Sequence, residues 1–525
     1  MKNFYFWLRC TIGYLKNNLT GQWLMVALGS SVALAVLQFG PILSDPDSFY
    51  HAGLTIWLRD YGLLKYFPWT QYSFYNQIFI DHHFGYHLLL IPFVSLWEPL
   101  VGIKIATWFF GSLTLAGFWW LIKTWCPPYW GYLVPVVLAA SPFLVRLSLA
   151  KAPVLSVGFL LLGYYLISQR KSGWFFGLAW AFVWFYSAWP LLFVMLAVFT
   201  VGGYFYDRFF LKKTWLDSIT KGGYKSLWLS LLFGTLVGLV INPYFPQNFL
   251  YLKQLFDMAL RPYHSFLAIG AEWYPFPWLD LVATNTFVVG LWLLATLVAI
   301  FNRSNIKKQT FITWLLASLF LVYTLRARRQ VEYMTPFMIL SAGLIIKDSW
   351  SQILDWATHR LEFLPNFLTS RLFGFFLVTY LSIALPLGVL IGYGRAYLSL
   401  HRGFGSDNLK PVAGWLKNNT PPNSLVWQTD WGTFPLLWYH NSHNYYLTGL
   451  DQTFMYAFSP DLYNKWRSLT TGQKRDDAYD VIKNDFKADY VLLEKRFPAL
   501  LYSLNRDNRF VREYQDKEVI IFSVN

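Results

Sequence analysis

The sequence predicts a polytopic α-helical membrane protein of about eleven transmembrane helices, with a small extracytoplasmic α/β domain at its C-terminal end. Of the 525 residues, 55% are hydrophobic and only 14% are charged, whereas soluble globular domains carry about 25% charged residues. Apolar runs close to the roughly 20 residues that cross a bilayer recur along the chain. The 27 Trp and 34 Tyr residues suit the aromatic belts that membrane proteins place at the lipid–water interface.

Each apolar run is expected to form one membrane-spanning helix. The predicted spans are residues 22–40, 84–98, 102–121, 130–146, 152–168, 174–206, 226–244, 278–301, 311–325, 333–346 and 372–395. The run at 174–206 is too long for one straight span, and we expect a kink at Trp189-Pro190, since proline breaks the helical ladder. Two half-spans are the alternative, but they would place five basic residues outside the cell, so one span is preferred.

The distribution of lysine and arginine predicts the orientation of the chain. With the N-terminus in the cytoplasm, the segments that fall inside are rich in basic residues; they are 207–225, 302–310 and 347–371. Loop 41–83, which holds only Arg59 and Lys65, then lies outside, as do loop 246–277 and the C-terminal part. We expect an uncleaved first span and an integral protein of a bacterial or archaeal plasma membrane.

We expect two domains. Residues 1–398 form the membrane domain, with external loops 41–83 and 246–277, and residues 399–525 form the C-terminal domain. In the second loop, residues 248–260 have the pattern of an amphipathic helix that lies at the membrane interface. Alternating elements after residue 400 predict a small α/β domain. Its expected strands are 424–431, 444–450, 488–496 and 518–524, and its expected helices are 462–470 and 477–486.

Composition also excludes several classes of protein. The net charge of +15 suits cytoplasmic loops and anionic lipid headgroups. The basic residues are dispersed and form no nucleic-acid-binding motif, so we expect no nucleic-acid partner. Cys10 and Cys126 are the two cysteines, too few for a disulfide framework or a thiolate metal site. The chain has no phosphate-binding loop motif, so nothing indicates use of ATP.

Acids and histidines gather in two short clusters, DPDSFYH at 45–51 and DHHFGYH at 81–87. Carboxylates and imidazoles at a membrane border are costly to desolvate, so the clusters predict the edge of an active site. Asp45 and Asp47 are predicted catalytic residues, one of which acts as general base for an acceptor hydroxyl or amide. His51 is predicted to contact substrate. Alternatively, the two acids only mark the end of a span and cap the helix that follows.

The second cluster predicts a metal site. Carboxylate and imidazole donors suit divalent transition ions, and His87 faces the same side as His83 if that segment is helical. The predicted ion is Mn or Mg, and its predicted ligands are Asp47, Asp81, His82 and His83. Alternatively, the histidines are interfacial residues that bond to loop carbonyls.

Three arginines break the charge pattern on the predicted external side. Arg326, Arg328 and Arg329 predict a site for a lipid phosphate or diphosphate, because guanidinium groups bind phosphate oxygens bidentately. A misplaced span, or arginines paired with Glu332 and with lipid, is the alternative. Glu272 in the late external loop is predicted to be a third catalytic acid.

The third candidate region is residues 429–456 of the C-terminal domain. Its aromatic, amide and acidic side chains suit the binding of a sugar or a peptide, and the predicted substrate contacts are Asp430, Trp431 and Asp451. Alternatively, the aromatic residues of this region form the core of the small domain or its contact with the helical bundle.

Together these features resemble the GT-C glycosyltransferases, which are multi-span enzymes that use polyprenyl-phosphate-linked sugar donors. They keep an essential acid in the first external loop, where Asp45 and Asp47 lie. The layout is similar to the catalytic subunits of oligosaccharyltransferases and to bacterial protein mannosyltransferase-like membrane proteins. The resemblance to oligosaccharyltransferase catalytic subunits implies roles for an acid in a late external loop and for a membrane-proximal arginine. The acid is matched here by Glu272, and the arginine by Arg326, Arg328 or Arg329.

The chain also departs from the oligosaccharyltransferase pattern. The peptide-binding motif W-W-D-Y-G is absent, and TDWG at 429–432 is only a loose counterpart. The second acidic pair of the membrane domain is missing from the short loop 122–129. We infer that Asp81-His82-His83, in the first external loop, replaces it.

The resemblance implies an enzyme that moves a sugar or oligosaccharide from a polyprenyl-phosphate or -diphosphate donor to a protein or glycolipid acceptor. We expect the ends of loop 41–83, Glu272 and the arginines to meet around this donor. A transporter or flippase of lipid-linked saccharides is the alternative, which would favour charges buried mid-span and symmetric repeats. A non-catalytic assembly protein is the third possibility.

Overall fold

The computed structural model describes residues 18–126, 129–212, 223–303, 305–353, 383–473 and 478–525. The chain divides into two compact units, each built from segments that lie far apart in the sequence. The bundle unit comprises Met1–Gly40, Ile105–Gly238 and Glu272–His401. The loop-and-sheet unit comprises Pro41–Lys104, Leu239–Ala271 and Arg402–Asn525, so most of both predicted external loops belongs to the same unit as the C-terminal segment.

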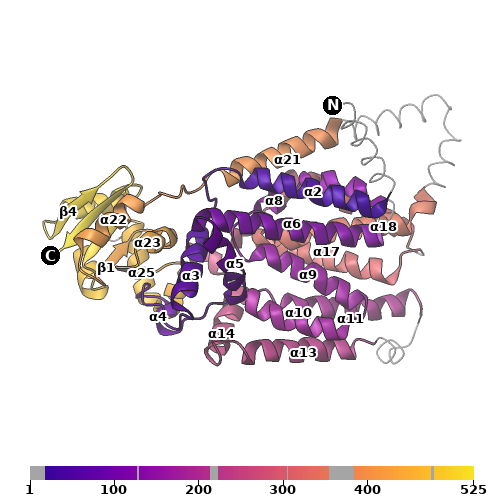
Figure 1. Ribbon diagram of the computed structural model, residues 1–525, viewed down its shortest axis with the longest axis horizontal. Helices are drawn as coiled ribbons and strands as arrows, with labels where there is room; N and C mark the ends of the chain where they lie inside the picture. The colour runs from indigo at the N-terminus through magenta and orange to yellow at the C-terminus, as the bar shows by residue number, and fades with distance from the viewer. Residues whose placement is uncertain (1–17, 127–128, 213–222, 304, 354–382, 474–477) are drawn as a thin grey trace. The chain divides into compact units, whose positions relative to one another are not determined.

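The bundle unit is helical. Its elements are α2 (Leu19–Gln38), α6 (Pro99–Trp125, which begins in the other unit), η1 (Tyr129–Leu133), α7 (Val134–Leu138), α8 (Ser141–Leu147), α9 (Pro153–Ser168), α10 (Ser172–Phe185), α11 (Leu191–Phe209), α13 (Lys225–Val240), α15 (Trp278–Thr284), α16 (Thr286–Phe301), α17 (Lys308–Arg326), η4 (Arg328–Gln330), α18 (Val331–Asp348) and α21 (Leu385–Leu400). Figure 1 shows α9, α10, α13 and α17 running roughly parallel to one another. Helix α18 packs against both α16 and α17, and every residue from Val331 to Ile345 is buried.

The helices support the predicted membrane class at a coarse level. Among the described residues, α2, α6, α11 and α17 are long and apolar enough to cross a bilayer, and the bent pair α15 and α16 would make a fifth. Four shorter apolar helices accompany them, α5 (Phe84–Leu96), α9, α10 and α13. The number of eleven spans stays a prediction, and residues 372–382 of the last expected span lie outside the described residues.

Three expected spans are not single straight helices. The run at 174–206 forms two helices, α10 and α11, separated by residues 186–190. The break includes the predicted Trp189-Pro190, because Pro190 lacks the N–H that would continue the ladder and instead stands at the start of α11; whether this run makes one span or two stays a prediction. The segment 130–146 is broken into η1, α7 and α8, and the segment 278–301 bends by 100° between α15 and α16.

The loop-and-sheet unit places helices from the two loops beside a small sheet domain. From the loops come α3 (Asp47–Tyr61), α4 (Phe74–Gln77), α14 (Gln247–Leu260) and η2 (Tyr263–Ser265), and α5 follows the first loop. The C-terminal segment supplies α22 (Lys410–Asn419), β1 (Leu425–Gln428), η6 (Trp431–Thr433), α23 (Phe434–His440), β2 (Tyr445–Tyr446), α24 (Gln452–Phe458), α25 (Pro460–Thr470), α26 (Ala478–Asp480), η7 (Val481–Asp485), β3 (Tyr490–Glu494), α27 (Pro498–Asn505), β4 (Phe510–Gln515) and β5 (Val519–Val524). The expected helix at 248–260 is confirmed as α14.

The sheet has five strands in the order β2-β1-β3-β5-β4. Strand β1 pairs in parallel with β2 and β3, whereas β5 pairs antiparallel with β3 and β4. The four strands expected from the sequence are confirmed, and the structure adds the edge strand β4, whose side chains are mostly exposed. The expected helix at 462–470 is confirmed as α25, and residue 477 of the other expected helix lies outside the described residues.

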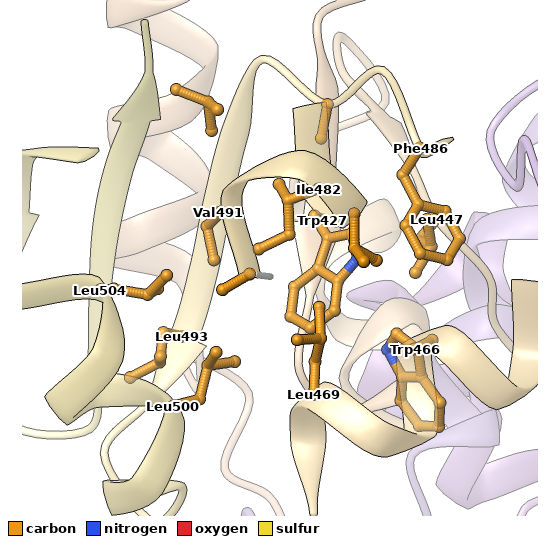
Figure 2. Packing of buried hydrophobic residues seen from close by; sticks show 14 of the residues in the cluster. Trp427, Leu447, Trp466, Leu469, Ile482, Phe486, Val491, Leu493, Leu500 and Leu504 are labelled. Atoms are coloured by element: carbon orange, nitrogen blue, oxygen red, sulfur yellow. The ribbon is translucent and has the colours of Figure 1, made fainter. Parts of the chain in front are cut away.

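Buried apolar side chains join the sheet to its helices. Trp427 of β1 lies at the centre of this core with Ile482 and Leu469, and Val491 and Leu493 of β3 lie beside them (Figure 2). Tyr263 and Leu267, from the second predicted external loop, belong to the same core. The end of that loop is therefore held by the apolar core of the small domain.

Truncating the central tryptophan is expected to destabilise the small domain. Trp427 is fully buried, and replacing a buried Trp with Ala costs about 3–5 kcal/mol through lost contacts and the cavity left behind. Trp427→Ala should lower the unfolding temperature of the purified protein, followed by tryptophan fluorescence. Tyr502→Ala, which truncates an exposed ring, is the control and should have little effect; equal effects of the two changes would contradict the assigned core.

Candidate functional site

Acids and histidines from loop 41–83 and the start of α5 gather within the loop-and-sheet unit. This acid–histidine cluster consists of Asp45, Asp47, His51, Asp81, His82, His83 and His87. The two sequence clusters are brought together because α3, which carries His51, packs against α5, which carries His87.

The acidic pair starts helix α3. Asp45 Oδ1 accepts a hydrogen bond from the backbone N–H of Asp47 at 2.9 Å, which forms the turn into the helix, and Asp47 is the first helical residue. Both residues are partly exposed and lie at the positive end of the helix dipole. This hydrogen bond gives Asp45 a structural role in the turn before the helix, while both acids are also partly accessible.

Behind the acidic pair lies a buried hydrogen-bonded chain of three side chains. Asp81 Oδ2 is 2.7 Å from His87 Nδ1, and His87 Nε2 is 2.7 Å from His51 Nδ1. His87 is fully buried, while His51 is 2% exposed and Asp81 is 5% exposed. The other carboxylate oxygen of Asp81 accepts the backbone N–H of His83 at 3.0 Å, so both oxygens of Asp81 are engaged.

The remaining histidines lie against aromatic rings. His82 Nδ1 is 3.0 Å from the hydroxyl of Tyr75, and its ring stacks on Tyr251 of α14 at 5.0 Å between centroids. The ring of His83 lies 5.2 Å from that of His51. Tyr50 also borders the cluster; burial raises the pKa of its phenol, and the nearby Asp81 carboxylate raises it further, so the phenol is neutral.

The arrangement of the predicted metal ligands shows whether they could hold an ion together. Among the residues that the structure describes, no three His, Cys, Asp or Glu side chains are arranged to hold a metal ion. The two carboxylate oxygens of Asp81 are hydrogen-bonded to His87 and to the backbone of His83, and His82 is hydrogen-bonded to Tyr75. Among the described residues, the predicted ligands Asp47, Asp81, His82 and His83 therefore do not form a ligand set.

A second cluster of charges lies in the bundle unit. This arginine–glutamate cluster consists of Arg146, Tyr186, Glu272, Arg329 and Glu332. Arg146 Nε donates to Glu332 Oε2 at 2.7 Å, and its Nη1 pairs with Glu272. Arg329 Nη1 lies 3.1 Å from Glu272 Oε1, and its Nη2 donates to the hydroxyl of Tyr186.

The cluster balances two guanidinium groups against two carboxylates. Burial opposes ionisation of Glu272, but Arg146 and Arg329 together hold the pKa of its carboxyl well below its usual range. Arg146 is 8% exposed and Glu332 is 1% exposed. Glu272 is therefore an ionised carboxylate held between two arginines, about a quarter exposed.

The predicted phosphate-binding arginines also hold the end of the late loop. Arg329 lies over the ring of Trp273 at 4.3 Å. The backbone N–H of Arg328 donates to Tyr274 O at 3.0 Å, and its side chain Nε donates to Pro275 O at 3.2 Å. Both Arg326 and Arg328 are exposed. In the described residues no carboxylate pairs with Arg328, whereas the charge of Arg329 is offset by Glu272.

Sequence reasoning missed Arg146, which pairs with both glutamates. It placed Arg146 at the end of the predicted span 130–146 and gave it no role. A single arginine within an otherwise apolar run is the signal that could have found it, because such a charge is costly near lipid unless it is paired.

No protein-family model and no curated protein matches this chain, but solved structures share its fold. The oligosaccharyltransferase of Archaeoglobus fulgidus in its apo form aligns with a TM-score of 0.63 at 11% identity, over 96% of this chain and 74% of that one. AglB from the same organism, in complex with an inhibitory peptide and a dolichol-phosphate, aligns with a TM-score of 0.62 at 13% identity and the same coverage. ArnT from Cupriavidus metallidurans, bound to undecaprenyl phosphate, aligns with a TM-score of 0.54 at 13% identity, over 96% of this chain and 98% of that one.

The chain shares its fold with these oligosaccharyltransferase and ArnT structures. The resemblance inferred from Asp45, Asp47 and the multi-span layout is thereby confirmed at the level of fold. The acidic pair belongs to one compact unit, and Glu272 with the arginines belongs to the other. Their meeting around one donor stays a prediction.

The three candidate residues of the C-terminal domain have local contacts. Asp430 caps η6 by accepting Gly432 N–H at 2.8 Å and pairs with Arg496. Asp451 caps α24 by accepting Thr453 N–H at 2.8 Å. Trp431 is partly buried against the core of the sheet. These contacts account for the fold of the region, and a substrate-binding role for the three residues stays a prediction.

Proposed function

We propose that this chain transfers a sugar or oligosaccharide from a polyprenyl-phosphate or -diphosphate donor to an acceptor on the extracytoplasmic face of the membrane. One observation carries the proposal: in a chain with the GT-C fold, a partly exposed pair of carboxylates, Asp45 and Asp47, stands at the start of α3 with imidazoles behind it. Carboxylates in this setting can accept a proton from a hydroxyl or amide.

The proposed reaction is a direct displacement. Asp47 or Asp45 takes the proton of the acceptor while the acceptor attacks the anomeric carbon, and the lipid phosphate leaves with the electron pair of the broken bond. Attack from the opposite face inverts the anomeric centre. Arg328 is the proposed phosphate contact of the arginine set, because its guanidinium is exposed and, within the described residues, no carboxylate offsets its charge.

The solved structures with this fold support the donor class. One of them holds a dolichol-phosphate and an inhibitory peptide, and another holds undecaprenyl phosphate. Because their identity to this chain is 13%, these structures establish only the shared fold. The lipid-phosphate donor and the protein or glycolipid acceptor of this chain are proposed.

A test with purified protein separates transfer from transport. The full chain in detergent is incubated with a mixture of polyprenyl-phosphate and polyprenyl-diphosphate sugars and with total acceptors from a strain that lacks the gene, and products are read by mass spectrometry. We expect a new glycoconjugate and released polyprenyl phosphate or diphosphate. A micelle has no second compartment, so a flippase would yield neither product. Absence of any glycan or glycoprotein difference between wild-type and deletion strains would also contradict the proposal.

A further inference from the structure

The acid–histidine cluster contains a buried chain of three hydrogen-bonded side chains that has no role in the reaction as proposed so far. Asp81, His87 and His51 come from a loop, α5 and α3, and their sequence separations are 6 and 36 residues. All three are at least nine-tenths buried. Burial without pairing is costly for such groups, and here each imidazole lies within hydrogen-bond distance of the next member.

The order of the atoms determines which nitrogens carry protons. An ionised Asp81 carboxylate only accepts, so His87 donates from Nδ1. A neutral His87 then has a bare Nε2, which accepts, so His51 donates from Nδ1. The assignment follows from the hydrogen-bond pattern, and it makes Nε2 the proton-accepting nitrogen of a neutral His51.

The chain ends beside the candidate general base. His51 stands four residues after Asp47 on α3, and side chains four apart lie on the same face of a helix, one turn from each other. Exposure falls along the series, from the partly exposed Asp47 to the buried His51 and the fully buried His87. A carboxylate that contacts the acceptor is thus backed by imidazoles that are closed off from bulk water.

We propose that Asp81 and His87 are positioning residues that orient His51, and that His51 takes up the proton released from the acceptor through Asp47. This inference rests on the proposed function. The O–H or N–H bond of the acceptor breaks as its bond to the anomeric carbon forms, and the electron pair of the sugar–phosphate bond leaves with the phosphate. The proton passes to the Asp47 carboxylate and then to His51 Nε2, and the imidazolium is stabilised by the Asp81 carboxylate through His87.

Other groups that face His51 also bear on its charge. From its own helix these are Asp47 and Tyr50; from α5 and the preceding loop they are His83, Tyr86, His87 and Asp81. The carboxylates favour an added proton on His51, whereas a second imidazolium at His83 or His87 would oppose it. One added proton shared by the chain is therefore the expected state during turnover.

The hydrogen-bond chain is tested first without any assay of activity. The full chain has nine histidines, so selective ¹⁵N-histidine labelling gives a tractable NMR spectrum, with His51→Gln and His87→Gln used to assign the two rings. We expect each ring in the wild type to show one protonated and one bare nitrogen. Asp81→Asn keeps an oxygen acceptor but removes the charge, and should move the resonances of both rings. Unchanged His51 resonances in Asp81→Asn would overturn the proposal.

The functional role is tested by kinetics on the same proteins. Asp81→Asn and His51→Gln should each lower kcat by about 10²-fold, the lower end of the range for general acid–base catalysis, while KM for the polyprenyl-linked donor changes less than two-fold. His401→Gln is the matched control, because His401 bonds through Nδ1 to the backbone oxygen of Tyr397 in the bundle unit, and its kcat should equal that of the wild type. Elution volume and unfolding temperature are recorded for each variant.

The outcomes separate this inference from the proposed function. Wild-type protein that transfers sugar, together with Asp81→Asn and His51→Gln variants of unchanged kcat, would overturn the proton-acceptor role and leave the proposed function standing. A wild type that transfers nothing would overturn the proposed function and with it the role of His51 in turnover, and the NMR arm would then decide only whether the hydrogen-bond chain exists. Loss of folding in Asp81→Asn with a fully active His51→Gln would also overturn the proposal, since the chain would then be structural.

Discussion

Replacing Asp47 with Asn is expected to abolish sugar transfer while the protein still folds. The amide has the shape of the carboxylate but cannot take a proton from the acceptor, and loss of a general base costs about 10²–10⁴ in rate. The turn into α3 uses the backbone N–H of Asp47 and the side chain of Asp45, so the change leaves the turn intact. Turnover of a polyprenyl-linked donor, measured together with elution volume and unfolding temperature, checks the prediction.

Asp45 needs a different pair of variants because it also supports the helix start. Asp45→Asn keeps the oxygen that accepts the N–H of residue 47 and removes only the charge, whereas Asp45→Ala removes both and should also cost about 0.5–2 kcal/mol in stability. A catalytic Asp45 would make both variants inactive. Normal turnover in Asp45→Asn and in Asp47→Asn would remove the central support for the proposed enzyme.

Replacing Arg146 with Met is expected to destabilise the bundle by about 3–5 kcal/mol, the cost of breaking a buried ion pair from one side. The change leaves Glu332, which is 1% exposed, without the guanidinium that lies 2.7 Å from it. It also removes one of the two arginines that hold Glu272 in its ionised form. Unfolding in detergent of proteins that also carry Cys10→Ser, followed by a thiol-reactive dye at the buried Cys126, measures the loss.

A double variant separates the effect of breaking the ion pair from the effect of changing the side-chain volume. Arg146→Met with Glu332→Met replaces both charges by apolar groups, and such replacements are often neutral, so much of the stability should return. Arg509→Met, which breaks an exposed pair with Asp507, is the control and should change stability by less than about 1 kcal/mol. A double variant less stable than Arg146→Met alone would contradict this account of the cluster.

The contribution of Glu272 to the stability of the folded protein depends on pH. The pKa of Glu272 lies below its ordinary value of 4.5 in the folded protein, so its contribution to stability is fully present above that value. The contribution is lost as pH falls through the lower folded pKa. The difference in stability between the wild type and Glu272→Gln should therefore be constant between pH 7 and pH 5.

Local patterns were enough to predict many elements. The apolar runs that became α2, α6 and α17, the amphipathic helix α14, and the strands β1, β3 and β5 all depend on periodicity and composition within short windows. Prediction was poorer where proline interrupts a continuous apolar run. Residues 130–146 and 174–206 have the hydrophobicity of a span, but a new helix begins at Ser141-Pro142 and another begins after Trp189-Pro190, so each run is divided into separate helices.

Residue types and spacing alone determined the fold class of this protein and identified the partly exposed acids Asp45 and Asp47, because hydrophobicity and the position of a charge after a span are local properties. Only the tertiary structure decided the partners of the buried groups. His51 and His87 are 36 residues apart, and Arg146 and Glu332 are 186 apart, yet each pair is in hydrogen-bond contact. Their partners depend on how helices pack, since a buried polar group must bond to whatever the fold brings within about 3 Å, and no window of sequence contains that information.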